Sequence, residues 1–287
     1  MLHVVHRGPR SYGLRTTRWT LATLLSQCPE LRVRTLAGLH QLLRRLRITW
    51  KRTRPHLRSP DPDYQAKLDH LQGLRAQVAA QPNAYVFTFL DEVTVMRQPT
   101  LANAYAAQGA EQRYAELSHQ ADRAIRLIAT LDALTGRVIY RRATQITVSM
   151  LVQFYRTLRE AYPQATRIYV VQDNWPVHFH PDVLVALEPQ HNPWPWRRPS
   201  NWPSEPSRSA TQRYGHLALP IQLVTLPTYA SWANPIEKLW RKLRQDVTHL
   251  HPWANDLPSL GHELDTFLDQ FALGSPALLR YVGLYPE

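Results

Sequence analysis

The sequence is poor in cysteine and has no long apolar run. Its 287 residues include a single cysteine, Cys28, which excludes an internal disulfide and a cysteine-rich zinc site and fits a reducing compartment. No apolar stretch approaches the roughly 18 residues of a membrane-spanning helix. The first residues, MLHVVHRGPR, lack the apolar core of a signal peptide. We therefore expect a cytoplasmic protein with no membrane partner.

Acidic residues are almost absent from the first 58 positions. This segment holds 13 Lys and Arg and one acid, Glu30, so its formal charge of +12 equals that of the whole chain. The remaining 229 residues hold 21 charges of each sign. Positive charge confined to one short segment indicates a module that binds phosphate. The alternative is a basic face that serves only solubility.

The pattern within residues 1–58 predicts a small DNA-binding fold. Apolar residues at helical spacing predict helices over Thr16–Gln27 and Thr35–Arg47, and Ile48–Arg52 reads as a short basic strand. This order is that of a helix-turn-helix with a wing, whose second helix would enter the major groove. An ordinary helical hairpin is the alternative. The candidate DNA-binding residues of this segment are Arg34, Arg44, Arg45, Arg47, Lys51, Arg52 and Arg54.

The rest of the chain predicts a linker followed by an α/β domain. Residues 59–83 read as a linker with one helix, Tyr64–Gln81. In the domain, residues 84–287, strands are expected at Ala84–Leu90, Ala124–Leu131, Arg137–Arg141, Arg167–Gln172 and Ile221–Leu226, with Val93–Met96 as hairpin partner of the first. Helices are expected at Val148–Ala161, Asn234–Leu250 and Leu257–Leu273. Strands that form a meander and then alternate with helices predict a mixed five-stranded sheet flanked by helices.

Residues 189–213 interrupt this alternation. The segment is crowded with proline, arginine and the tryptophans Trp194, Trp196 and Trp202, and it shows no periodicity, so we expect a long loop. Its aromatic and arginine content suits stacking on unpaired bases. The alternative is a mobile surface loop whose tryptophans pack on the domain.

Three carboxylates stand in settings typical of a metal site. Asp91 and Asp173 each follow an apolar run that predicts a buried strand, and Glu237 begins an amphipathic helix. Magnesium binds through a few carboxylates plus substrate phosphate, and two such ions can clamp both oxygens of a phosphodiester. The alternatives are that the aspartates form turns, and that Glu237 completes a capping box with Asn234 as N-cap and Pro235 at the first helical position.

Neighbouring side chains extend this candidate site. Glu92 follows Asp91, but alternation along a strand places the two on opposite faces. Asn174 and His178 follow Asp173 closely enough to orient water or phosphate, although His178 could equally be a structural histidine. Lys238 and Arg241 lie on the predicted outer face of the Glu237 helix, where they could meet DNA phosphates or simply be solvated.

Four strings resemble the DDE transposases of the mariner superfamily, in particular its bacterial insertion-sequence branch. They are FLDE at Asp91, LDALTG at 131–136, VVQDNWPVH at Asp173, and LPTYASWANPIEKLWRKLR at 226–244. The resemblance covers about residues 84–275, and the basic segment resembles the second, winged helix-turn-helix of such enzymes. It implies a ribonuclease H-like fold and places Asp91, Asp173 and Glu237 on the family's catalytic, metal-binding positions, with Asn234 beside them.

The resemblance also implies an activity and partners. These are cleavage at element ends with two Mg²⁺ or Mn²⁺ ions, followed by strand transfer by a 3′-hydroxyl. The partners would be double-stranded DNA, as terminal inverted repeats and target, and a second copy of the chain on that DNA, associated with a bacterial nucleoid. Two other functions are considered: a truncated, catalytically silent DNA-binding protein that acts as a repressor or domesticated factor, and a non-transposing nuclease or resolvase.

Three features depart from the family pattern. First, we expect this chain to lack the first helix-turn-helix of such enzymes. Asp173 and Glu237 are 64 residues apart, about twice the spacing of close relatives, and the segment 189–213 accounts for the excess. Ser231, Trp232 and Ala233 replace the usual proline and leucine before Asn234. None of these changes removes a catalytic carboxylate.

Overall fold

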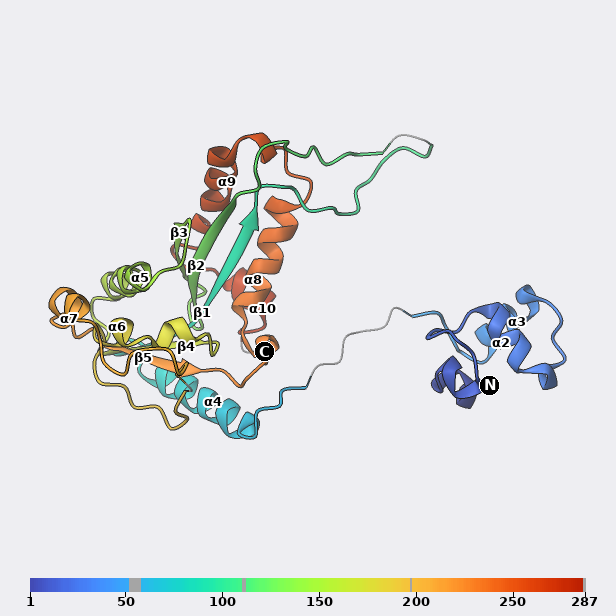
Figure 1. Ribbon diagram of the computed structural model, residues 1–287, viewed down its shortest axis with the longest axis horizontal. Helices are drawn as coiled ribbons and strands as arrows, with labels where there is room; N and C mark the ends of the chain where they lie inside the picture. The colour runs from blue at the N-terminus through green and yellow to red at the C-terminus, as the bar shows by residue number, and fades with distance from the viewer. Residues whose placement is uncertain (52–57, 110–111, 197, 286–287) are drawn as a thin grey trace. The chain divides into compact units, whose positions relative to one another are not determined.

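The chain forms two compact units, residues 1–57 and 58–287, which are described separately. A computed structural model describes residues 1–51, 58–109, 112–196 and 198–285 (Figure 1). Arg52 and Arg54, both predicted to contact DNA, lie outside these described residues.

The N-terminal unit is a small helical cluster. Its helices are α1 (Leu2–His6), α2 (Leu21–Gln27) and α3 (Leu36–Arg45), with short 3₁₀ helices at Pro9–Tyr12 and Pro29–Leu31. Its core consists of Trp19, Leu24, Leu39 and Leu43. The two predicted helices form, but α2 begins later than expected. Its start is fixed by a reciprocal hydrogen-bonded cap between Thr20 and Thr23, which satisfies the first free N–H groups of the helix.

The predicted basic strand does not form in the part of it that the structure describes, residues 48–51. Arg47 adopts a left-handed backbone conformation with φ of 57°, which turns the chain back after α3. The Ile48 N–H then donates to the Leu43 carbonyl at 2.8 Å, and the Ile48 side chain packs on the helical core. Ile48 thus closes the end of α3, where a wing was expected to begin.

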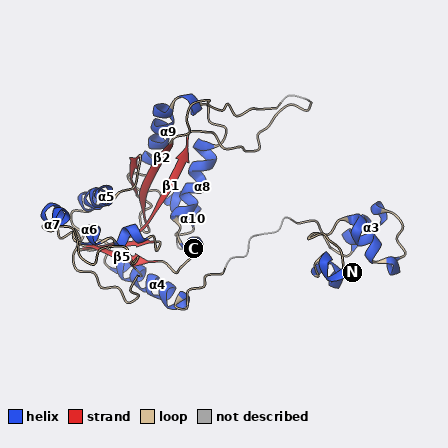
Figure 2. Ribbon diagram, in the orientation of Figure 1, coloured by secondary structure: helices blue, strands red, loops and turns tan. Residues whose placement is uncertain are grey.

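The larger unit is built on the predicted mixed, five-stranded sheet (Figure 2). Its strands are β1 (Tyr85–Met96), β2 (Ala124–Asp132), β3 (Val138–Ala143), β4 (Arg167–Gln172) and β5 (Ile221–Thr225). Their order is β3-β2-β1-β4-β5; the first three are antiparallel, and β4 and β5 run parallel to β1.

One correction concerns β1. The two predicted hairpin strands, Ala84–Leu90 and Val93–Met96, are a single strand. Residues 88–96 pair without interruption with β2, whereas the parallel pairing with β4 stops at Phe89. Asp91 therefore lies inside a strand, at the point where β1 extends past the end of β4 and remains paired with β2.

Helices cover both faces of the sheet, because side chains alternate along each strand. Phe87 and Phe89 of β1 face a core shared with α4 (Tyr64–Ala80), α8 (Ile236–Leu243), α9 (Leu257–Asp269) and α10 (Pro276–Val282). Val86 and Leu90 face the opposite core, shared with α5 (Val148–Ala161), α6 (Pro181–Leu184) and α7 (Arg208–Tyr214). No helix in the described residues is both long enough and apolar enough to cross a membrane.

Several helices differ from the expectation. The helix of the expected linker forms as α4, but it packs on the sheet through Leu71 and Val78 and belongs to the larger unit. The helix after Asn234 begins at Ile236 and closes with a π-helical turn, Arg244–Thr248. The short helices α1, α6, α7 and α10 were not predicted. A serine caps both α7 and α10, and the cap of α7, Ser207, is held by Asp182, 25 residues earlier in the chain.

Candidate active site

The sheet places Asp91 and Asp173 side by side. The last parallel pair between β1 and β4 joins Phe89 to Val171. Asp91 and Asp173 each follow that pair by two residues, so both lie where the ladder between β1 and β4 ends. Asp91 is on the sheet face that α8 covers. Asp91 is half-buried, whereas Asp173 is exposed.

Glu237 reaches the same place from α8. The buried residues Ile236, Leu239 and Trp240 fix the rotation of the helix against the sheet, and Glu237 lies half-buried in its first turn. The predicted capping box is absent: Pro235 is the N-cap and makes no side-chain cap. The Asn234 amide instead donates to the Leu90 carbonyl at 3.2 Å. Asn234 thus ties the start of α8 to β1 beside Asp91, and helix capping does not explain Glu237.

The electrostatics of Asp91 reflect this gathering of carboxylates. Burial, followed by the negative charges of Glu237, Glu92 and Asp173, raises the pKa of Asp91 from 3.8 to about 8, although the Glu92 N–H opposes the shift. The Trp240 Nε1–H donates to Asp91 Oδ2 at 3.0 Å and fixes the carboxyl group. Asp91 is therefore protonated near neutral pH unless a cation compensates its neighbours.

The charge around Glu237 is mixed. Burial raises the pKa of Glu237, the nearby Arg244 and Arg241 lower it, and Asp173 raises it. Arg241 and Arg244 are both exposed, so they present positive charge beside the carboxylates.

The donor set suits a magnesium-type ion. No three His, Cys, Asp or Glu side chains among the described residues form a complete ligand group. Magnesium, however, usually takes one or two carboxylates and completes its coordination with water and substrate phosphate. A carboxyl whose pKa is raised by carboxylate neighbours marks a place where a cation would be favoured. The residues present therefore fit such an ion.

A buried histidine lies behind Asp173. His178 is fully buried, and its Nε2 is 3.4 Å from Glu92 Oε1 and 3.8 Å from Asp173 Oδ1. Neither ring nitrogen makes a hydrogen bond of good geometry with any described residue, so His178 is not a satisfied structural histidine. Glu92 lies on the opposite face of β1 from Asp91, as alternation predicts, and the sequence analysis assigned it no role.

Two other predicted site residues have structural contacts. The Asn174 amide donates to the Leu226 carbonyl at 2.9 Å and joins the chain segments that leave β4 and β5. The Lys238 Nζ donates to the Val282 carbonyl at 2.7 Å, so this lysine links α8 to α10. We correct the expectation that Lys238 faces DNA phosphates, because its ammonium group is engaged within the fold.

The loop that leads into α8 is anchored by a buried ion pair. Asp61 Oδ2 accepts hydrogen bonds from Lys67 Nζ at 2.7 Å and from the Thr228 N–H at 2.8 Å. Burial raises the pKa of Asp61, but the bonds from Lys67, Thr228 and the Asp63 N–H outweigh it and lower the pKa to about 2. The sequence analysis did not single out this anchor, because the bond from Thr228 to Asp61 joins residues more than 160 positions apart.

The mixed sheet with helices on both faces is a ribonuclease H-like domain, as predicted. Residues 86–257, more than half of the chain, match the family model described as DDE superfamily endonuclease. The chain belongs to this family of DDE endonucleases.

Relatives support the same assignment. Over 250 residues the chain is 21% identical to the 39 kDa protein of insertion element IS630 from Shigella sonnei. The match covers 86% of this chain but only 63% of the length of that protein. The structure is similar to the Mos1 mariner transposase in its paired-end complex with Mn, with a TM-score of 0.56, 15% identity, and coverage of 92% of this chain and 73% of that one. The Mos1 paired-end complex with the left transposon end is similar with a TM-score of 0.51 and 14% identity. The match covers 94% of this chain and 76% of that one. At these identities the similarity shows the fold.

Proposed function

We propose that this protein is a transposase that binds insertion-sequence ends and carries out metal-dependent DNA strand cleavage and strand transfer. The observation that carries the proposal is that Asp91 and Asp173 lie together where the β1–β4 ladder ends, with Asp173 and Glu237 both close enough to raise the pKa of Asp91. Membership of the DDE endonuclease family supports it, as do relatives whose names refer to insertion elements and transposon ends.

Asp91, Asp173 and Glu237 would hold two Mg²⁺ or Mn²⁺ ions, the metals of the related Mos1 complexes. Such ions activate a water or 3′-hydroxyl and neutralise charge on the leaving oxygen. The protein's own contribution is positional. Trp240 orients the Asp91 carboxyl, and Asn234 holds the start of α8 against β1.

Auxiliary residues act around this triad. His178 and Glu92 support Asp173 from the buried side, and Asn174 fixes the chain that follows Asp173. Arg241 is exposed near Glu237 and is placed to meet a DNA phosphate.

The N-terminal unit would supply affinity for double-stranded DNA. Of its predicted contact residues, those that the structure describes are all exposed: Arg34, Arg44, Arg45, Arg47 and Lys51. Arg44 and Arg45 end α3, the second of the two predicted helices. The natural substrates would be terminal inverted repeats and target DNA in a bacterial nucleoid, bound by two copies of the chain because two ends must be joined.

The test of catalysis is Asp173→Asn. We expect this variant to lose cleavage of a duplex that carries the element end in Mg²⁺ or Mn²⁺, while its affinity for that duplex stays within twofold of wild type. Asp69→Asn, an exposed aspartate of α4, is the matched control and should cleave normally. Cleavage retained in Asp173→Asn would contradict the mechanism. A wild-type protein that binds ends but never cuts them would favour the silent DNA-binding alternative.

The test of DNA binding is Arg44→Ala with Arg45→Ala. Each phosphate contact that is lost should reduce the slope of log affinity against log salt by about 0.9. We therefore expect the double variant to bind duplex more weakly and with a slope that is smaller by about 2, measured by fluorescence anisotropy from 50 to 300 mM salt. An unchanged slope would show that α3 does not contact phosphate.

A further inference from the structure

The segment 189–213 is folded against the domain by its tryptophans. Trp196 stacks on Phe179 with ring centres 4.2 Å apart and planes at 17°, Trp202 packs edge-on against His180, and Trp194 packs edge-on against His70. All three indoles are half-buried, so each keeps part of its surface exposed. Packing on the domain was one of the two expectations for this segment. It holds the rings in fixed positions.

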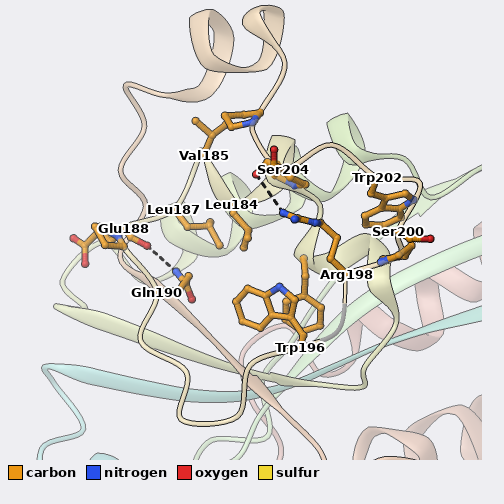
Figure 3. A pocket seen from close by; sticks show the side chains of 15 residues that line it. Leu184, Val185, Leu187, Glu188, Gln190, Trp196, Arg198, Ser200, Trp202 and Ser204 are labelled. Atoms are coloured by element: carbon orange, nitrogen blue, oxygen red, sulfur yellow. Dashed lines mark hydrogen bonds between the residues drawn. The ribbon is translucent and has the colours of Figure 1, made fainter.

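Two cavities adjoin at Trp196, which lines both. The larger, of about 780 Å³, lies between the segment 184–190 and the arm 196–206, and Figure 3 shows Leu184 and Leu187 across from Arg198 and Trp202, with Trp196 between them. The smaller, of about 320 Å³, is lined by Trp194, Trp196 and Asn174 among others. Asn174 is the residue after Asp173. The two hollows thus extend from Asn174, the residue that follows the proposed catalytic aspartate, to Arg198.

The charges at the larger cavity favour an anionic ligand. Glu188 is its acidic lining residue, and Glu188 is ion-paired with Arg167 at 3.3 Å. The Arg198 guanidinium is exposed and donates one long hydrogen bond, at 3.3 Å, to the Ser204 carbonyl. A guanidinium has five N–H donors in a fork that matches phosphate. Arg198 therefore has donors left over for an anion beside an aromatic wall.

We propose that these two cavities bind an unpaired DNA strand that leaves the active site, with bases against Trp194, Trp196 and Trp202 and a phosphate on Arg198. This inference rests on the proposed function, because that function makes DNA the substrate. A base presents a flat ring that stacks on tryptophan whatever its identity, and positive charge beside stacked aromatics is the usual device for single strands. Cavities of this size accommodate nucleotides rather than a duplex.

The first experiment is photo-crosslinking of the full-length protein. The probe is a ten-nucleotide oligothymidylate that carries 5-iododeoxyuridine, irradiated with the protein and mapped by mass spectrometry. We expect adducts on Trp194, Trp196 or Trp202. Adducts confined to residues 1–57 would overturn the proposal, because the strand would then be held by the basic unit alone.

Two variants test the contacts by affinity for the same oligonucleotide. Binding is measured at a salt concentration that weakens the phosphate contacts of residues 1–57. Trp196→Ala and Arg198→Gln should each weaken single-strand binding, the tryptophan variant by about 5- to 100-fold, and leave duplex binding unchanged. Arg213→Gln is the matched control, since Arg213 belongs to the same segment, is exposed, and lines neither cavity.

The outcomes separate this proposal from the proposed function. If Trp196→Ala lowers the melting temperature, Arg198→Gln still tests the site, because the Arg198 side chain is exposed and makes one hydrogen bond to the described residues. Affinities of both variants within twofold of wild type would overturn the proposal and leave the tryptophans with a packing role. Metal-dependent cleavage by wild type without adducts in 189–213 would refute this site alone. Adducts there without any cleavage would support this site and refute the transposase.

Discussion

Replacement of Asp91 by asparagine should remove a pH-dependent part of the stability of the metal-free protein. Asparagine has nearly the shape of aspartate and keeps a carbonyl oxygen that can accept the Trp240 Nε1–H bond. It cannot take a negative charge. The variant therefore isolates the cost of ionising Asp91 among its carboxylate neighbours, with little change in packing.

The sign and size follow from the raised pKa. The folded protein holds the Asp91 proton up to a pKa of about 8, against an ordinary value of 3.8. This preference stabilises the fold fully below the ordinary pKa and is lost as pH rises through about 8. One pKa unit corresponds to about 1.4 kcal/mol. Between pH 6 and pH 8 wild type should therefore lose about 2 kcal/mol that Asp91→Asn does not lose.

Urea denaturation in EDTA at pH 6 and pH 8 measures this difference. Titrating groups that do not interact with Asp91 are common to both proteins and cancel in the comparison. The coupled carboxyls Glu237, Glu92 and Asp173 belong to the measured difference. A stability gap between wild type and variant that is equal at the two pH values would refute the electrostatic argument. Millimolar Mg²⁺ should stabilise wild type at pH 8 more than the variant, because a bound cation favours the Asp91 carboxylate.

Two further predictions concern the frame around the site. Lys67→Met should destabilise the protein by about 3 kcal/mol in urea denaturation at pH 7, because it leaves the buried Asp61 carboxylate without its cation. Recovery of stability in the double variant with Asp61→Asn would confirm the cause, and an unchanged stability of Lys67→Met would contradict it. Gly136→Ala should cost at least about 2 kcal/mol, since Gly136 has φ of +69° and an added Cβ would lie 2.5 Å from the Ser275 carbonyl oxygen. A melting temperature equal to that of wild type would contradict this reading.

Apolar runs predicted the five strands, because buried strands must carry continuous apolar side chains. The length of β1 escaped prediction. Asp91 and Glu92 break the apolar run, but the ladder with β2 is formed by backbone groups and continues past them. The strand predicted at Ile48 does not form over residues 48–51 for a similar reason. The chain reverses at Arg47, and a left-handed backbone conformation at an arginine cannot be predicted from the pattern of apolar residues.

The three carboxylates of the proposed site could be singled out from sequence because each stands next to a recognisable local pattern. Their partners could not. Trp240 is one of the buried residues of α8, but spacing along a helix does not say which strand residue its N–H will meet. The pairing of His178 with Glu92 depends on how a turn after β4 folds over β1, which is a long-range contact.

The Asp61 anchor joins the start of the larger unit to the chain between β5 and α8. Asp61 lies three residues beyond Arg58, the first residue of that unit, and accepts the Thr228 N–H. Thr228 lies three residues after the end of β5 and nine residues before Glu237. A displacement of the first residues of the larger unit would therefore act on the turn between β5 and α8, and from there on both the sheet and the loop that carries Glu237.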